Sequence, residues 1–371
     1  MPSKPPRALQ VYAGPRALAH LRERGLRPAD VRVIPAAAGG PKGLILNPLD
    51  RYLFGHWLGG AAPARTSLAA PLPSLHLLGA SIGAWRMACA MAPDADRALA
   101  DLAHGYIHQR FDLVDGRPPQ PSVVSRLFAD TLAQQLGGQE AQLLAHPRYR
   151  LHVFTSRGRG PLLRHGGRLG TPLGYLGAFG SNLLHRRALG GWLQRVVFSD
   201  PREPLPFKLH DFNSHSVRLT PANLGPAVLA SCSIPFVLQP VLAIPGAPRG
   251  AYWDGGITDY HLHLDYASMA DGLVLYPHFQ QALVPGWLDK SLRHRHGASA
   301  KLSNVVVLAP HPDWVRSLPG AKLPDRHDFK TWQHDAPGRI RVWQQAVAAA
   351  QQLADEAADW LARPTQDALP L

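Results

Sequence analysis

Short, mostly apolar segments bounded by glycine or proline recur along this chain and alternate with segments of helical periodicity. These segments are Val31 to Ala37, Leu75 to Leu78, Leu151 to Thr155, Leu273 to Tyr276 and Val305 to Ala309. Because most of their positions are apolar rather than every second one, they predict buried strands of a mostly parallel sheet. Helices are predicted between them, at Leu44 to Leu58, Ala84 to Met91 and Asp96 to Tyr106. This alternation predicts a layered α/β fold.

The length of the chain predicts one large domain. Its 371 residues, 46% of them hydrophobic, can build a sizeable core and exclude wholesale disorder. We expect a single domain over residues 1–371, in which 157–199 forms a candidate lid or interfacial insertion. Apolar residues at spacings of three and four from Arg339 to Leu361 predict one amphipathic C-terminal helix within 336–363, ending near Pro364.

Cysteine usage and the N-terminus indicate the compartment. Only Cys89 and Cys232 are present, too few for a disulfide scaffold or a thiolate zinc site, so we expect a reducing environment. The first 25 residues contain no apolar export segment, and no run reaches the roughly 18 apolar residues of a membrane span. The sequence therefore predicts a cytoplasmic protein whose membrane contact is peripheral, at the inner membrane face.

The motif with the clearest chemistry is Gly79-Ala80-Ser81-Ile82-Gly83. It follows a predicted strand and precedes a predicted helix. A Gly-x-Ser-x-Gly in that context is typical of a nucleophile elbow, in which Gly79 and Gly83 allow strand and helix to pass closely and the serine is presented above the sheet. An ordinary glycine-rich turn is the alternative interpretation.

Two further glycine motifs accompany it. Ala38-Gly39-Gly40-Pro41-Lys42-Gly43 lies between another strand and helix, where free backbone N–H groups can hold a phosphate or a developing oxyanion. Pro41 has no N–H, so Gly39 and Gly40 are the donors in the middle of this loop. Downstream, Asp254-Gly255-Gly256 follows two aromatic residues, which can hold an aspartate at a strand end facing a pocket. By itself, an Asp-Gly pair is more often a turn.

Together these motifs resemble those of the patatin-like phospholipase family. The Gly-rich loop with Lys42, the Ser81 motif and the Asp254 motif occur in that family's order, and Ala230 to Pro235, followed by Gln239-Pro240-Val241, resembles its segment ahead of the aspartate. The resemblance runs from about Val31 to about Tyr276. Ala38 replaces the first glycine of the family's loop, and Pro41 is unusual beside the donors.

The resemblance implies a three-layer α/β/α fold and a serine lipid acyl hydrolase, that is, a carboxylic ester hydrolase without cofactor or metal. Ser81 would be the nucleophile and Asp254 the base of a Ser-Asp dyad, and Gly39 and Gly40 would form the oxyanion hole. Lys42 and Gly43 would support the loop, and Gly255 and Gly256 would shape the aspartate turn. The alternatives are an acyltransferase that uses an alcohol acceptor, and a catalytically silent lipid-binding or anion-binding protein.

Histidine chemistry stays open at this point. Nineteen histidines leave a His-based triad as an alternative. Asp259, His261 and His263 alternate and could hold a metal on one strand face, although a solvated polar strand face is the preferred interpretation.

The net charge of +13 predicts an anionic partner. Residues 141–199 contain no acidic residue, and the arginines there alternate with leucines and aromatic residues, as in a surface that meets lipid headgroups. We expect an acyl-ester lipid substrate and no nucleic acid partner, because no aromatic-bearing RNA-binding motif is present. Peripheral contact with an anionic membrane is assigned to Arg157, Arg159, Arg164 and Arg168.

Overall fold

A computed structural model describes residues 6–59, 72–111, 116–164 and 167–371, with side chains omitted at 167–169. Its described strands form one mixed sheet in the order β10-β1-β9-β8-β2-β3-β4-β5-β6, and β7 pairs with β4. The strands are β1 Leu9–Ala13, β2 Val31–Ala36, β3 Leu75–Ala80, β4 Tyr149–Gly158, β5 Leu193–Ser199, β6 Ser214–Arg218, β7 Tyr252–Trp253, β8 Leu273–Pro277, β9 Val305–Pro310 and β10 Leu369–Pro370.

The sheet is mostly parallel, as the apolar runs predict. β9, β8, β2, β3 and β4 run parallel to one another, whereas β1 pairs antiparallel with β9 and β5 pairs antiparallel with β4. All five predicted strands are present, and each is buried along its length apart from single half-buried positions. Strands β5 and β6 were not predicted, because polar residues take a larger share of their positions, with Gln194 and Arg195 adjacent in β5 and four polar residues among the five of β6.

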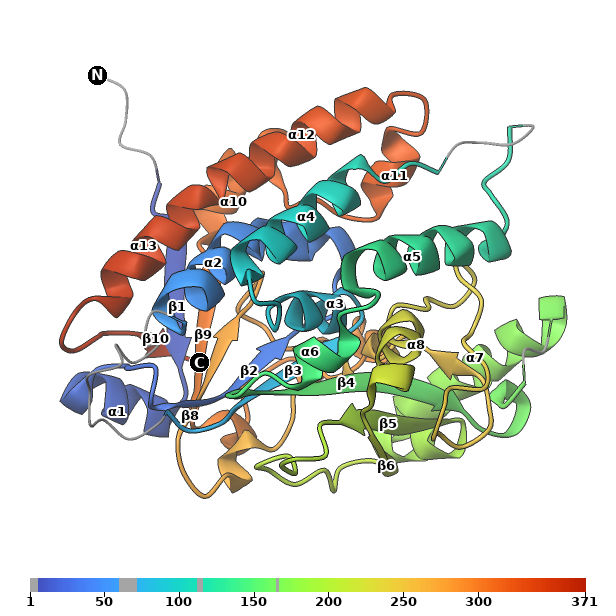
Figure 1. The fold of residues 1–371 in the computed structure, drawn as a ribbon, viewed down its shortest axis with the longest axis horizontal. Helices are drawn as coiled ribbons and strands as arrows, with labels where there is room; N and C mark the ends of the chain where they lie inside the picture. Colours follow the sequence, from blue (N-terminus) through green and yellow to red (C-terminus); the bar gives the residue numbers. More distant parts are fainter. Residues whose placement is uncertain (1–5, 60–71, 112–115, 165–166) are drawn as a thin grey trace.

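Helices surround the sheet in an arrangement consistent with a three-layer α/β/α fold (Figure 1). Helices α2, α3, α4, α12 and α13 lie together on one side of it, and α1 packs on β1 and β9 at one end. The helices are α1 Pro15–Arg24, α2 Asn47–Tyr52, α3 Ile82–Cys89, α4 Ala95–His108, α5 Pro121–Leu136, α6 Glu140–Leu144, α7 Gly167–Leu184, α8 Pro221–Ser231, α9 Gly256–Asp259, α10 Pro312–Ser317, α11 His327–Thr331, α12 Ala336–Ala349 and α13 Gln351–Leu361. Among the described residues, no helix is both long and apolar enough to cross a membrane.

Two predicted helices are wrong in detail. The helix predicted over Leu44 to Leu58 is a 3-10 turn, Gly40–Leu46, followed by α2 and a π-helical turn, Leu53–Trp57. The C-terminal helix is two helices, α12 and α13, which meet at Ala350. Helix α12 packs on α4, whereas α13 packs on α2 and β1. No proline or glycine marks this interruption in the sequence.

The segment 157–199 is divided between the sheet and its surroundings. It begins in β4 and ends in β5, which pair with each other. Between these strands lie the 3-10 turns Gly160–Leu162 and Arg186–Gly191 and helix α7. The part of this segment that leaves the sheet is therefore centred on α7.

Candidate active site

Ser81 lies in the tight turn between β3 and α3. Its backbone adopts φ 56° and ψ −132°, a conformation that residues with a side chain rarely adopt and that costs conformational energy. Glycine is required on both sides of it. A Cβ added at Gly79 would lie 2.2 Å from the Ala84 Cα, and one added at Gly83 would lie 2.0 Å from the Ala36 oxygen. The motif therefore forms the strained strand-to-helix turn that it predicts.

The Ser81 hydroxyl donates a hydrogen bond to the Asp254 carboxylate, and the Oγ–Oδ2 distance is 2.6 Å. Both side chains are buried, with 3% of Ser81 and 5% of Asp254 exposed. The other carboxylate oxygen accepts a 2.7 Å bond from the Gly256 N–H. Burial raises the pKa of Asp254, while the nearby Arg326 guanidinium and these hydrogen bonds oppose that rise. Two groups 173 positions apart in the chain thus meet in direct contact.

The segment before Asp254 holds the serine and the aspartate together. The Ser231 hydroxyl accepts a 2.8 Å bond from the Ser81 N–H and donates a 2.7 Å bond to the Phe154 carbonyl oxygen in β4. The Asp254 N–H donates to the Ser233 carbonyl oxygen at 2.9 Å. Ser231 lies in the segment Ala230 to Pro235 ahead of the aspartate, but nothing in the sequence of that segment indicated this bridging contact.

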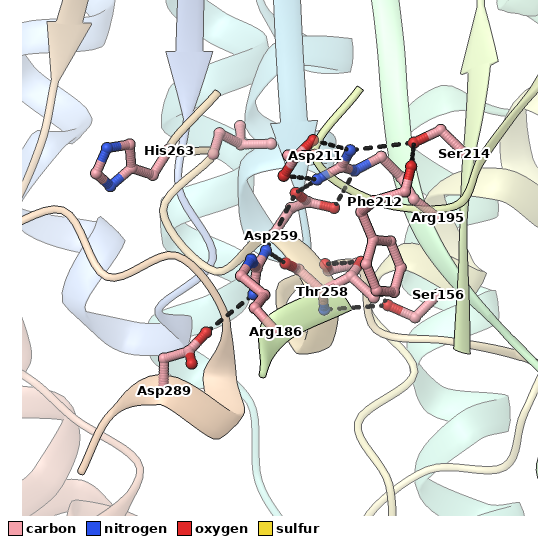
Figure 2. A network of polar contacts seen from close by, with 12 residues as sticks. Ser156, Arg186, Arg195, Asp211, Phe212, Ser214, Thr258, Asp259, His263 and Asp289 are labelled. Atoms are coloured by element: carbon pink, nitrogen blue, oxygen red, sulfur yellow. Dashed lines mark hydrogen bonds and ion pairs between the residues drawn. The ribbon is translucent and has the colours of Figure 1, made fainter. Parts of the chain in front are cut away.

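A buried ionic network fixes the chain that follows Asp254 (Figure 2). The Ser156 hydroxyl donates to the Asp254 carbonyl oxygen at 2.9 Å and contacts the Thr258 hydroxyl at 3.0 Å. Next along the chain, Asp259 accepts a 2.7 Å hydrogen bond from the Nε of Arg195. Arg195 also pairs with Asp211, at 2.8 Å. These contacts anchor the aspartate turn to β4 and β5.

This network corrects the interpretation of Asp259, His261 and His263 as a solvated strand face. Asp259 ends helix α9, and both Asp259 and His261 are buried. The His263 ring contacts the Leu283 carbonyl oxygen and the Ser299 hydroxyl instead of a shared ion site. Within the described residues, no group of three histidine, cysteine or acidic side chains could hold a metal ion.

The glycine loop follows β2 and lies beside the nucleophile turn. Strands β2 and β3 are parallel, with Ala36 opposite Gly79, so both loops leave the same edge of the sheet. The Ala38 N–H donates to the Tyr260 carbonyl oxygen at 2.9 Å, whereas the N–H groups of Gly39 and Gly40 make no hydrogen bond to another described residue. These two groups are free to stabilise an oxyanion.

The neighbours of this loop explain its sequence. A Cβ at Gly39 would lie 2.6 Å from the Phe279 ring, and a Cβ at Gly256 would lie 2.6 Å from the Ala38 Cβ. Pro41 occupies the first turn of the 3-10 segment, where an N–H has no partner within the helix. Gly43 faces Ile82 and Arg86 of α3, and Arg86 forms a buried ion pair with Asp50 of α2. The loop is thereby packed against the helix that carries the nucleophile.

A small cavity opens onto Asp254, and Arg326 lines it together with Ala38, Ile234, Gly256, Tyr260 and Trp287. Arg326 also lines a second, mostly apolar cavity of about 420 Å³, formed by Phe111, Pro118, Pro119, Val124, Phe236, Val237, Phe329, Lys330 and Gln333. Arg326 lies beyond the last recognised sequence motif, so no signal in the sequence indicated its place at the site.

No imidazole lies within hydrogen-bonding distance of Ser81 or Asp254 in the described part of the chain. The hydroxyl of Ser81 contacts Asp254, and its N–H contacts Ser231. The described geometry is therefore that of a two-residue dyad, and it does not contain the His-based triad that the sequence left open.

The arginines of residues 141–199 do not form one continuous exposed surface. Arg195 is fully buried, and Arg150 pairs with Glu203 at 2.9 Å. Arg157 donates to the Arg249 carbonyl oxygen and to Gln194, and Arg159 donates to the Gly190 carbonyl oxygen. Arg164 is exposed, and the Arg168 side chain lies outside the described residues. Several arginines of this stretch therefore bind partners within the fold instead of facing solvent freely.

Comparison with known proteins adds no assignment. No family model matches the chain, and no similar protein was found among the curated proteins.

Proposed function

We propose that this protein is a serine hydrolase of carboxylic esters that acts on acyl-ester lipids. The observation that carries the proposal is the 2.6 Å hydrogen bond from the Ser81 Oγ to the Asp254 Oδ2, made at a strained turn beside two backbone N–H groups that bond to no other described residue. A nucleophile, a base and oxyanion donors are the parts needed for acyl transfer through a serine.

In this mechanism, the Ser81 Oγ attacks the ester carbonyl carbon while its proton passes to the Asp254 carboxylate. The N–H groups of Gly39 and Gly40 stabilise the negative oxygen of the tetrahedral intermediate. When the intermediate collapses, Asp254 returns the proton to the leaving oxygen, which departs as an alcohol and leaves the acyl group on Ser81. Water then loses a proton to Asp254, attacks the acyl-enzyme and releases a carboxylic acid, and the proton returns to Ser81.

The environment of Asp254 supports its role as a base. A free aspartate is a weak base for a hydroxyl group, and burial raises the pKa of this one. Arg326 opposes that rise, because a nearby positive charge favours the ionised carboxylate that accepts the proton.

A lipid substrate is favoured by the apolar surroundings of the site. The 420 Å³ cavity beside Arg326 is lined by phenylalanine, valine and proline side chains, which suit an acyl chain. Helix α7 also exposes large apolar side chains, with 64% of Leu173, 66% of Leu176 and 87% of Leu184 accessible. We infer that α7, with Arg164 near its start, contacts the lipid surface peripherally.

The test is covalent labelling with a fluorophosphonate, with the adduct located by mass spectrometry. We expect labelling of Ser81, its loss in Ser81→Ala, and a fall of at least about 10³-fold in turnover of a short acyl ester by Asp254→Asn. Ser317→Ala is the control, because within the described part of the chain the Ser317 hydroxyl bonds only to the Trp314 carbonyl oxygen. Labelling at another serine, or full turnover by Asp254→Asn, would refute the dyad.

Two alternatives predict different results in the same assay. An acyltransferase would form more acyl product than free acid when an alcohol acceptor is supplied. A catalytically silent binding protein would bind lipid vesicles but would show no Ser81-dependent turnover.

A further inference from the structure

Three cationic side chains near the glycine loop and the dyad form no ion pair with an acidic side chain among the described residues. Arg326 lines the Asp254 cavity, and its Nε lies 3.1 Å from where a Cβ on Gly40 would be. The Lys290 ammonium lies 4.1 Å above the ring of Tyr260, which lines the same cavity. The Lys42 ammonium lies 5.6 Å from the centre of the Phe279 ring, which packs against Gly39.

The positive charges of these side chains repel one another. Burial, together with the charges of Arg326 and Lys42, lowers the pKa of Lys290 to about 8. Asp254 lies near both Arg326 and Lys290, and its single negative charge balances one of these two positive charges. The acidic neighbour of Lys42 is Asp325. An excess of positive charge at the mouth of a site is unfavourable in the empty protein, and a bound anion relieves it.

One of these cations, Arg326, also borders the apolar cavity. Arg326 lines both cavities, so it connects the Asp254 cavity with the proposed chain-binding surface. Its side chain is exposed and can be reached by a ligand. A guanidinium forms paired hydrogen bonds with phosphate and carboxylate oxygens, which a neutral headgroup cannot accept in the same charge-assisted way.

We propose that Arg326 and Lys290 recognise an anionic group, a phosphate or a carboxylate, that the substrate carries close to its scissile ester. This inference rests on the proposed esterase function and makes it more specific. The substrate is then an anionic amphiphile, whose ester lies at Ser81, whose charge lies at Arg326 and Lys290, and whose apolar chain occupies the adjoining cavity.

The first experiment measures kcat/KM for three esters. Octanoyl glycerol phosphate carries a phosphate, monooctyl succinate carries a carboxylate, and octanoyl glycerol is neutral. We expect the wild type to prefer an anionic ester by roughly 10-fold or more, since charge-assisted hydrogen bonds are among the stronger ones. The preference should fall by about the same factor in Arg326→Gln and in Lys290→Gln. Arg341→Gln is the matched control, because Arg341 is exposed on α12 and makes no ion pair to a described residue. Equal use of the charged and neutral esters, with Ser81-dependent turnover intact, overturns the anion site and leaves the esterase.

A binding measurement decides the inference if none of the three esters is hydrolysed. Octyl phosphate is titrated calorimetrically into the wild type, Arg326→Gln and Arg341→Gln. Binding that weakens about 10-fold or more in Arg326→Gln alone supports the site even when the esterase proposal fails. Equal binding by all three proteins, or no binding, overturns it. If inorganic phosphate binds as tightly as octyl phosphate, the site is one for free phosphate, and the assignment to an anionic amphiphile is wrong.

Discussion

At the scale of the residue, Asp254 is both a buried carboxylate and the proposed base of the dyad. Its carboxylate accepts hydrogen bonds from the Ser81 hydroxyl and the Gly256 N–H, while burial raises its pKa. A raised pKa means that the folded protein holds the proton more tightly than the unfolded chain does. The ionised form therefore lowers the stability of the fold at neutral pH, and stability increases as the pH falls toward that pKa.

Asp254→Asn should accordingly raise the melting temperature at neutral pH while it removes ester turnover. Asparagine keeps an acceptor for the Gly256 N–H and a polar group beside Ser81, so the local geometry is retained. The gain over the wild type should shrink as the pH is lowered, because the wild-type carboxylate becomes protonated. Thermal unfolding monitored by circular dichroism across a pH series measures this, with the exposed Asp313→Asn as control. A lower melting temperature for Asp254→Asn at neutral pH would contradict the argument.

At the scale of the element, α7 joins the proposed lipid surface to the site. The ring of Tyr175 on this helix lies 5.7 Å from that of Phe236, which lines the apolar cavity. Leu173 and Leu176 lie on the exposed part of the same helix. An exposed apolar helix face next to an apolar cavity is suited to an enzyme that takes substrate from a lipid surface.

Replacing Leu173 and Leu176 together by serine should weaken co-sedimentation with anionic vesicles by roughly 10-fold or more, because burying one leucine side chain contributes about 1.5–3 kcal/mol. Serine leaves the net charge unchanged, so the loss would report on apolar insertion. Leu369→Ser is the control, since Leu369 is a similarly exposed apolar residue in β10. Undiminished sedimentation of the double variant would exclude α7 as the contact.

At the scale of the whole molecule, the two ends of the chain stabilise each other. Strand β10 pairs with β1, and α13 packs on β1. The Glu356 carboxylate accepts hydrogen bonds from the N–H groups of Ala8 and Leu9, at 3.0 and 2.8 Å. The C-terminal helices are therefore part of the same cooperative structure as the sheet that carries the dyad.

Glu356→Ala should lower the free energy of unfolding by about 2–3 kcal/mol, because it leaves buried N–H groups of β1 and its preceding residue without acceptors. Urea denaturation of the full-length protein measures this loss. Asp355→Ala is the matched control, since Asp355 is exposed and, among the residues that the structure describes, bonds only to the Gln351 side chain. Similar stability of the two variants would show that the ends of the chain are not coupled through Glu356.

Local sequence patterns determined the main strands and the Ser81 turn. Mostly apolar runs identified the five central strands, since burial on both faces favours apolar side chains at successive positions. Glycines at 79 and 83 identified the elbow, since no other residue fits where the backbones of β3, α3 and β2 meet. Patterns of this kind are visible because the constraint acts on residues close together in the chain.

Only the tertiary structure decided which distant groups meet. The sequence indicated Asp254 through a family resemblance, but the fold brings its carboxylate to Ser81 and adds Ser231, Arg326 and Lys290. In the fold, Arg195, which lies in the arginine-rich stretch 141–199, is a buried partner of Asp259. The periodicity of apolar residues in a sequence indicates which positions are buried. The partner of a buried charge depends instead on strand order and loop packing, which bring together residues far apart in the chain.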